Sequence, residues 1–224
     1  MAIDARTSTT HEPVGRAAAL LLLAGGVGFF AGGGLHPKDD GHGDKLAQLH
    51  SMLVDPAWYP AHVVLLVGMT GFAAGIVALR WRGGQPRHLE RLLAVAAPVA
   101  VVAALGAVVH LFAATQATAI EDGSSTWLVH LFTGVETVVN PVWGVTIAAL
   151  AAVGATAGIG NRVVAPLGVV GGLAYALAVA TIAFTDTFDV LFPVGSLLGL
   201  WAVAVAVVAG SPSIHRQMGS PKGR

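Results

Sequence analysis

The chain has 224 residues, of which 55% are hydrophobic and only 11% are charged, against roughly 25% charged in a typical soluble domain. This composition excludes an ordinary soluble domain, and the balance of 12 basic and 12 acidic residues leaves no excess of basic residues that would suggest a nucleic-acid partner. Because there is no cysteine, disulfides, thiolate metal ligands and iron–sulfur clusters are excluded, and any metal or cofactor must be held by His, carboxylate, Met or backbone groups.

Six stretches are long and apolar enough to cross a lipid bilayer, which takes about 20 residues of helix. The sequence therefore predicts an all-α fold, a polytopic bundle of six transmembrane helices forming a single domain over residues 17–209. It lies between an N-terminal tail, 1–16, and a C-terminal tail, 210–224. The predicted spans are 17–35, 61–79, 92–114, 127–155, 164–184 and 190–209.

Two of these spans have a special feature. The first is longer than the apolar core of a typical signal peptide and no clear cleavage site follows it, so we expect an uncleaved anchor. The fourth is too long for one straight crossing. It contains Asn140-Pro141, where the missing N–H of proline predicts a kink or a start outside the bilayer.

Basic residues set the predicted orientation, because Lys and Arg near helix ends are retained on the cytoplasmic side. With both tails in the cytoplasm, only Lys38 and Lys45 lie outside. We therefore expect a multi-pass protein of a plasma membrane with cytoplasmic N- and C-termini. The basic residues predicted to lie inside are Arg6, Arg16, Arg80, Arg82, Arg87, Arg91, Arg162, Arg216, Lys222 and Arg224.

The first extracytoplasmic loop, residues 36–59, has predicted structure of its own. Asp44 is a plausible N-cap, and Leu46, Leu49 and Leu53 lie on one face of a short amphipathic helix. Such a helix lies on the membrane surface or over the bundle, so we interpret the loop as a lid.

Glycine is abundant, with 29 residues that include Gly25-Gly26, Gly28 and the run 32–34. In membrane helices, glycine allows neighbouring backbones to approach closely. The glycines therefore predict a tightly packed bundle.

The nine histidines are distributed unevenly. His11, His88 and His215 fall in cytoplasmic segments, whereas the other six fall on the outer side or in the outer half of the bundle. Of these six, His110 and His130 occur in a local repeat, Val-His-Leu-Phe, on either side of the turn at 121–123, which predicts that they face each other from adjacent helices. The outer histidines are His36, His42, His50, His62, His110 and His130.

The fourth span carries a polar stripe of His130, Thr133, Glu136, Thr137 and Asn140, which lie within about 120° of one another on a helix. Glu136 is the only acid that we place inside a span, where a buried carboxylate needs a partner. It is a candidate proton carrier, metal ligand or partner of a histidine.

Three interpretations of these residues remain open. His110 and His130, or either with His62, are candidate axial ligands of haem b. Alternatively, a divalent ion such as copper or zinc binds among the outer histidines and acids. In the third, the stripe with Glu136 forms a pathway for protons or a small solute. Against all three, outer-end histidines also serve as plain interfacial residues.

The hypothesis that we take forward is a haem- or metal-centred protein of electron transfer or metal handling. The alternative is a small-solute or proton transporter, or an accessory subunit with membrane-protein partners. The chain has none of the motifs H-E-x-x-H, H-x-x-x-H, G-x-S-x-G and G-x-x-x-x-G-K-[ST], which leaves open whether it is an enzyme. The candidate cofactor-binding residues are His62, His110, His130 and Glu136, and the candidate metal ligands of the loop are His36, His42, His50, Asp39 and Asp40.

Overall fold

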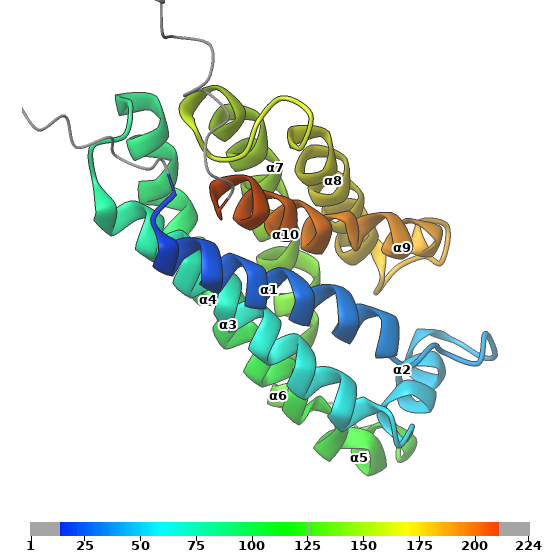
Figure 1. Ribbon diagram of the computed structural model, residues 1–224. Helices are drawn as coiled ribbons and strands as arrows, with labels where there is room; N and C mark the ends of the chain where they lie inside the picture. Colours follow the sequence, from blue (N-terminus) through cyan, green and yellow to red (C-terminus); the bar gives the residue numbers. More distant parts are fainter. Residues whose placement is uncertain (1–13, 125, 211–224) are drawn as a thin grey trace, which may run out of the picture.

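The computed structural model describes residues 14–124 and 126–210, and within these ranges every regular element is a helix (Figure 1). Five helices are long and apolar enough to cross a membrane, and a sixth apolar helix has 17 residues. The predicted all-α membrane helix bundle is thereby confirmed, with one predicted span shorter than expected. Most of both predicted tails, with His11 and His215, lies outside the described residues.

The long helices correspond closely to the predicted spans. They are α1 (Arg16–Leu35), α3 (Trp58–Arg82), α4 (Arg87–Phe112), α7 (Asn140–Ala157), α8 (Ala165–Thr181) and α10 (Leu197–Gly210). The short elements are α2 (Lys45–Leu53), η1 (Ala113–Gln116), α5 (Ala117–Glu121), α6 (Trp127–Gly134), η2 (Val135–Val139), η3 (Asp189–Leu191) and α9 (Phe192–Gly195). The fourth span runs continuously through α6, η2 and α7.

The fourth span contains a π-helical turn, η2, directly before Pro141. Proline has no N–H, and its ring crowds the carbonyl one turn earlier, so a regular α-helical ladder cannot continue through it. The backbone N–H of Asn140 instead donates to the carbonyl of Val135, five residues back. The disturbance predicted at Pro141 is thus a widened turn that keeps the helix continuous, and Glu136 lies within it.

Glycines let the helices approach until backbone touches backbone. A Cβ built on Gly71 of α3 would lie 2.7 Å from the backbone nitrogen of Gly25 in α1. A Cβ built on Gly144 of α7 would lie 2.7 Å from the carbonyl oxygen of Gly172 in α8. Only a hydrogen atom fits at such positions, so the predicted tight packing is confirmed at α1–α3 and α7–α8.

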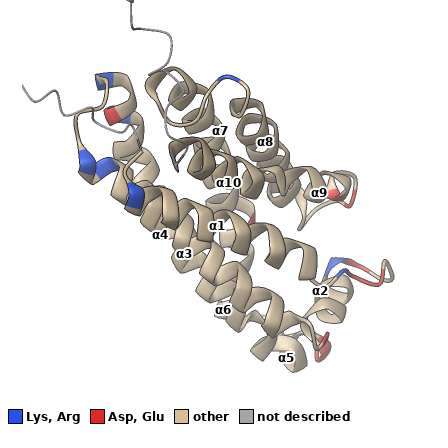
Figure 2. Cartoon of the chain, viewed as in Figure 1, with Lys and Arg blue, Asp and Glu red and all other residues tan. Residues whose placement is uncertain are grey.

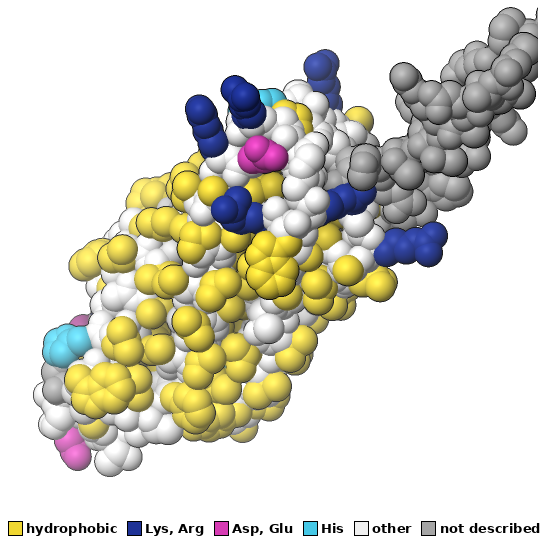
Figure 3. Space-filling view, turned by 90° about the vertical axis from the view of Figure 1, so that its left-hand side faces the viewer, with side chains coloured by type: hydrophobic (Ala, Val, Ile, Leu, Met, Phe, Trp, Pro, Cys, Tyr) yellow, Lys and Arg dark blue, Asp and Glu magenta, His cyan; other side chains and the backbone are white. Residues whose placement is uncertain are grey.

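Apart from the buried Glu136 in the fourth span, the charged residues lie towards the two ends of the bundle (Figure 2). We call one of them the arginine end, because the described arginines lie there, at or beside helix termini. The opposite end, which carries Lys38, Lys45 and most of the acids, we call the histidine end. On the face shown in Figure 3, hydrophobic side chains are spread over the surface between the ends, as a lipid-facing belt requires. The arginines of the arginine end are Arg16, Arg80, Arg82, Arg87, Arg91 and Arg162.

Replacing Gly71 by alanine should destabilise the bundle, because the new methyl group would overlap the backbone of α1. Overpacking of this kind typically costs about 1–3 kcal/mol. Gly134→Ala is the matched control, since nothing lies within 4 Å of an added Cβ there and alanine suits a helix better by roughly 0.5–1 kcal/mol. Thermal unfolding in detergent, monitored by circular dichroism, measures the stability of both variants. A Gly71→Ala protein that unfolds no earlier than Gly134→Ala would contradict this account of the packing.

Candidate functional site

Three histidines from three segments meet at the histidine end. His36 follows α1, His62 lies in the second turn of α3, and His110 lies in the last turn of α4. A ligand nitrogen from each ring lies within 4.8 Å of those of the other two. The ring centroid of His62 lies 4.5 Å from that of His110 and 4.7 Å from that of His36. We call these residues the three-histidine cluster.

Backbone carbonyls orient two of the three rings. Nδ1 of His36 lies 2.7 Å from the carbonyl oxygen of Pro37, and Nδ1 of His62 lies 2.6 Å from that of Trp58. A carbonyl oxygen only accepts, so Nδ1 carries the proton in both rings and Nε2 presents a lone pair. Burial, followed by the neighbouring His110, lowers the pKa of His36 to about 4, so this imidazole is neutral at physiological pH.

The Nε2 atom of His62 is the most unusual polar atom of the cluster. The side chain is only 2% exposed, and this nitrogen has no hydrogen-bond partner among the described residues. Leaving a buried acceptor unpaired costs about 1–3 kcal/mol. A bound group that accepts this lone pair would remove the cost.

The third ring is oriented by a buried carboxylate. Nδ1 of His110 lies 2.5 Å from Oε1 of Glu136, and the side-chain amide of Asn140 donates to the same oxygen at 2.9 Å. Glu136 is 5% exposed and is held in the π-helical turn η2. In metalloproteins, a carboxylate that accepts from the outer nitrogen of a histidine fixes the tautomer and direction of the ligand nitrogen.

Aromatic side chains pack around the cluster. The ring of Trp58 stacks on His62 at a centroid distance of 3.8 Å, and its Nε1 donates to the carbonyl of Leu111 at 3.3 Å. Phe132 meets His110 edge-on at 4.8 Å. Trp58 precedes His62 by one helical turn, so both side chains leave α3 on the same face. The i, i+4 spacing of Trp58 and His62 is the sequence signal for this contact.

A cavity of about 1120 Å³ extends from the cluster into the bundle. Its polar lining includes the three histidines and Glu136, whereas most of its wall is apolar. Phe29 and Tyr175 lie at its inner end, and each ring contacts Trp143, at 5.4 and 5.5 Å. Together with Phe72, 5.5 Å from Trp143, these rings form an aromatic layer between the cavity and the arginine end.

Residues of the first loop, for which we predicted a lid, line the cavity. The side chain of Asp44 accepts from the backbone N–H groups of Leu46 and Ala47, so the predicted N-cap of α2 is confirmed. Leu53 is buried beside α5, while Leu46, predicted for the same apolar face, is exposed. Across the cavity, Lys45 pairs with Asp186 in the loop after α8. The helix α2 therefore bridges two sides of the histidine end.

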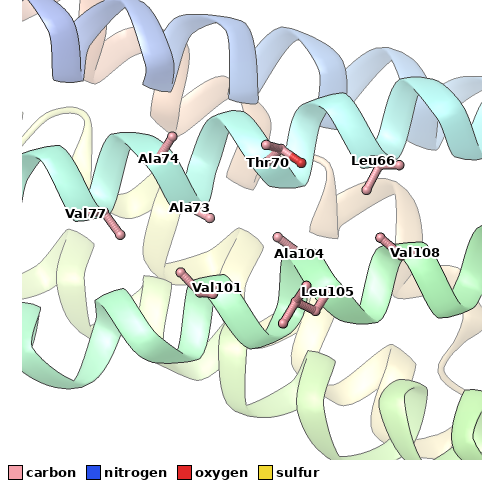
Figure 4. A pocket seen from close by; sticks show the side chains of 9 residues that line it. All are labelled: Leu66, Thr70, Ala73, Ala74, Val77, Val101, Ala104, Leu105 and Val108. Atoms are coloured by element: carbon pink, nitrogen blue, oxygen red, sulfur yellow. The ribbon is translucent and has the colours of Figure 1, made fainter.

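A second hollow, of about 350 Å³, lies between α3 and α4 and contains no titratable side chain (Figure 4). Its only polar side chain is Thr70, and the rest of its lining consists of Ala, Val and Leu. Without a charged or metal-binding group, this groove offers no chemistry. The candidate site is therefore the three-histidine cluster with its cavity.

His130 lies outside the three-histidine cluster, contrary to the expectation that it faces His110. Its side chain is exposed, whereas Glu136, six residues later, is buried. Six residues along a helix separate two side chains by about 120° around its axis, so they point to different sides. His110 pairs with Glu136 instead.

The other loop candidates are also not brought to the cluster. His42 is exposed, and Nε2 of His50 lies 3.9 Å from a carboxylate oxygen of Glu121. One oxygen of Asp39 accepts from the backbone N–H of Gly41, and one of Asp40 accepts from that of His42. Both acids thus stabilise the turn before α2, although Asp39 also lines the cavity.

Comparison with family models, with curated proteins and with solved structures finds no match to this chain. Its function must therefore be inferred from the site. The site offers three imidazole nitrogens with free lone pairs, a buried carboxylate behind one of them, and a largely apolar cavity in front. This arrangement is suited to coordination chemistry.

Removing the ion pair between Lys45 and Asp186 should loosen the lid. In Asp186→Asn we expect faster hydrogen–deuterium exchange of the α2 amides near neutral pH, because one of the two sides that hold α2 is lost. Asp122→Asn, which changes another exposed acid at the same end, should leave the exchange of α2 unchanged. Equal exchange of α2 in the wild type and Asp186→Asn would contradict the role of this pair.

The protection of the α2 amides should depend on pH in a defined direction. The hydrogen bond from Lys45 lowers the pKa of Asp186 below its ordinary value of 3.8. A carboxylate with a lowered folded-state pKa stabilises the fold above its ordinary pKa, and this contribution is lost as the pH falls through the lowered value. Protection of α2 in the wild type should therefore persist at neutral pH and decrease only in strong acid.

Proposed function

We propose that this multi-pass membrane protein binds one transition-metal ion, zinc or copper, through Nε2 of His36, His62 and His110. The observation that carries this proposal is the convergence of three imidazoles whose Nδ1 atoms are all engaged elsewhere. Their Nε2 atoms are the remaining donors, and imidazole is a preferred ligand of both metals. A metal ion would also satisfy the buried, unpaired Nε2 of His62.

The distances in the cluster suit a metal after a small contraction. Zinc–nitrogen bonds of about 2.0–2.1 Å place tetrahedral ligands about 3.4 Å apart. The present limit of 4.8 Å requires each nitrogen to move inward by less than about 1 Å. Three protein ligands with a fourth position free is the composition of catalytic rather than structural zinc sites. Here the fourth position would face the cavity.

The geometry supports a metal ion better than haem b. Two axial histidines of a haem must leave room for the porphyrin between them. The rings of His62 and His110 stack at a centroid distance of 4.5 Å, which leaves no room for a porphyrin between them. The pairing of His110 with His130 has no support, since His130 is exposed.

A transport function has less support than a metal site. Glu136 already accepts hydrogen bonds from His110 and Asn140, both at Oε1, which gives the buried carboxylate two structural partners. The aromatic layer around Trp143 lies between the cavity and the arginine end. A solute would have to displace this layer to cross the bundle.

We further propose that the histidine end faces away from the cytoplasm, in a plasma membrane, with one domain over 17–209 and both tails in the cytoplasm. The arginines of the described helices all lie at the opposite end, and arginines are retained on the cytoplasmic side. The metal would then be taken from, and act in, the extracytoplasmic compartment.

The purified protein should bind one zinc or copper ion per chain, measured by elemental analysis after equilibrium with a competing chelator. Glu136→Gln should weaken binding by about 10–100-fold, as the loss of an outer-shell partner typically does, and His62→Gln or His110→Gln should weaken it more. His130→Gln and His42→Gln are matched controls that should bind like the wild type. An equal loss in His130→Gln, or no bound metal in the wild type, would refute the assignment.

The orientation can be tested by labelling single introduced cysteines, because the chain has no cysteine of its own that would react. Ser124→Cys places a thiol at the exposed histidine end, and His88→Cys places one at the exposed arginine end. On intact cells, a membrane-impermeant maleimide should label Ser124→Cys and leave His88→Cys unlabelled until the cells are lysed. The reverse pattern would mean that the protein has the opposite orientation in the membrane, with the metal site on the cytoplasmic side.

A further inference from the structure

We infer that the cavity beside the three-histidine cluster binds an amphipathic small molecule. Its oxygen-bearing polar head would bind at the metal, and its apolar tail would lie between α1, α8 and α9. This inference rests on the proposed function, because the head group needs the metal. The inference adds to the proposed metal site the chemical class of the ligand that binds there.

The cavity exists because two helices that touch in the middle of the bundle separate towards the histidine end. Gly26 and Gly33 lie on the same face of α1, since seven residues make nearly two turns. A Cβ built on Gly26 would lie 2.5 Å from the carbonyl oxygen of Gly199 in α10. At Gly33 and at Gly34, nothing lies within 4 Å of an added Cβ, and both glycines line the cavity. The end of α1 therefore leaves space for a ligand.

The residues that line the cavity determine which chemical class of ligand it can bind. The cluster and Glu136 lie at one end, and charged residues of the first loop and of η3, among them Lys38, Lys45 and Asp189, line the side of the lid. Most of the remaining lining is apolar, with side chains such as Phe29, Val179 and Ile182. A fully charged solute would lose hydration against the apolar part of this wall. A wholly apolar molecule would leave the polar end unpaired. A molecule with one polar head and an apolar body satisfies both ends.

The size and the rim of the cavity fit such a ligand. Pockets for small molecules usually have volumes of about 300–1,000 Å³, and this one has about 1120 Å³. Phe184 and Val190 line it and are each 75% exposed, so apolar side chains extend from the cavity to the surface of the bundle. Exposed apolar residues at the rim suit a molecule that partitions into the bilayer.

Cobalt(II) in place of zinc provides a visible absorption spectrum that reports ligands at the fourth position. The cobalt-loaded protein in lipid nanodiscs should be titrated with acetohydroxamate and with octanohydroxamate, which share a metal-binding head and differ by six methylene groups. We expect octanohydroxamate to bind at least tenfold more tightly to the wild type, because its tail is buried in the cavity. In Gly33→Leu, the added side chain fills the space for the tail. The affinity for octanohydroxamate should then fall at least tenfold, while cobalt and acetohydroxamate bind as before.

Gly134→Leu is the matched control, because nothing lies within 4 Å of an added Cβ there and the residue does not line the cavity. It should bind both hydroxamates like the wild type, which removes partitioning into the nanodisc as a cause. Equal affinities for the two hydroxamates, or unchanged octanohydroxamate binding in Gly33→Leu, would overturn the inference and leave the metal site standing. A protein that takes up no cobalt would overturn the proposed function, and the inference with it.

Discussion

The bundle has to accommodate a carboxylate in its interior, and the hydrogen bonds of Glu136 meet this requirement. A buried carboxylate without partners is far too costly for an apolar environment. Here one oxygen accepts from both His110 and Asn140, and the π-helical turn before Pro141 places the acid beside them. The same interaction fixes the direction in which His110 presents its other nitrogen. The cost of burying the acid and the geometry of the three-histidine cluster are therefore linked.

Glycine determines where the bundle is tight and where it is hollow. At Gly25 and Gly71 the backbones of α1 and α3 touch, and at Gly26 the backbone of α1 meets α10. Further along α1, Gly33 has no neighbour, because α10 is replaced there by the short elements η3 and α9. Close contact in the middle of the bundle and separation near one end create the cavity.

The sequence predicted the parts of this structure that depend on one helix at a time. Hydropathy located the spans, because the length of an apolar helix follows directly from the bilayer. The position of Asp44 predicted the start of α2, and the burial of Glu136 required a partner. The sequence could not show which histidines share a site, since this depends on the rotation of separate helices about their axes. His130 illustrates the problem, because the local repeat suggested His110 as its neighbour while the packing turns it outward.

On the proposed function, one site binds two kinds of ligand. The position of the cluster near the ends of helices explains how both would reach it. His36, His62 and His110 lie at or within two turns of helix termini, where antiparallel helices bring side chains to a common depth. On that function, an ion would reach this depth from water, past the first loop and the pair of Lys45 with Asp186. An amphipathic molecule would reach it from the bilayer, along the apolar wall. A site deeper in the bundle would be closed to the ion by the cost of dehydration, and a site in the loop would lack the apolar wall.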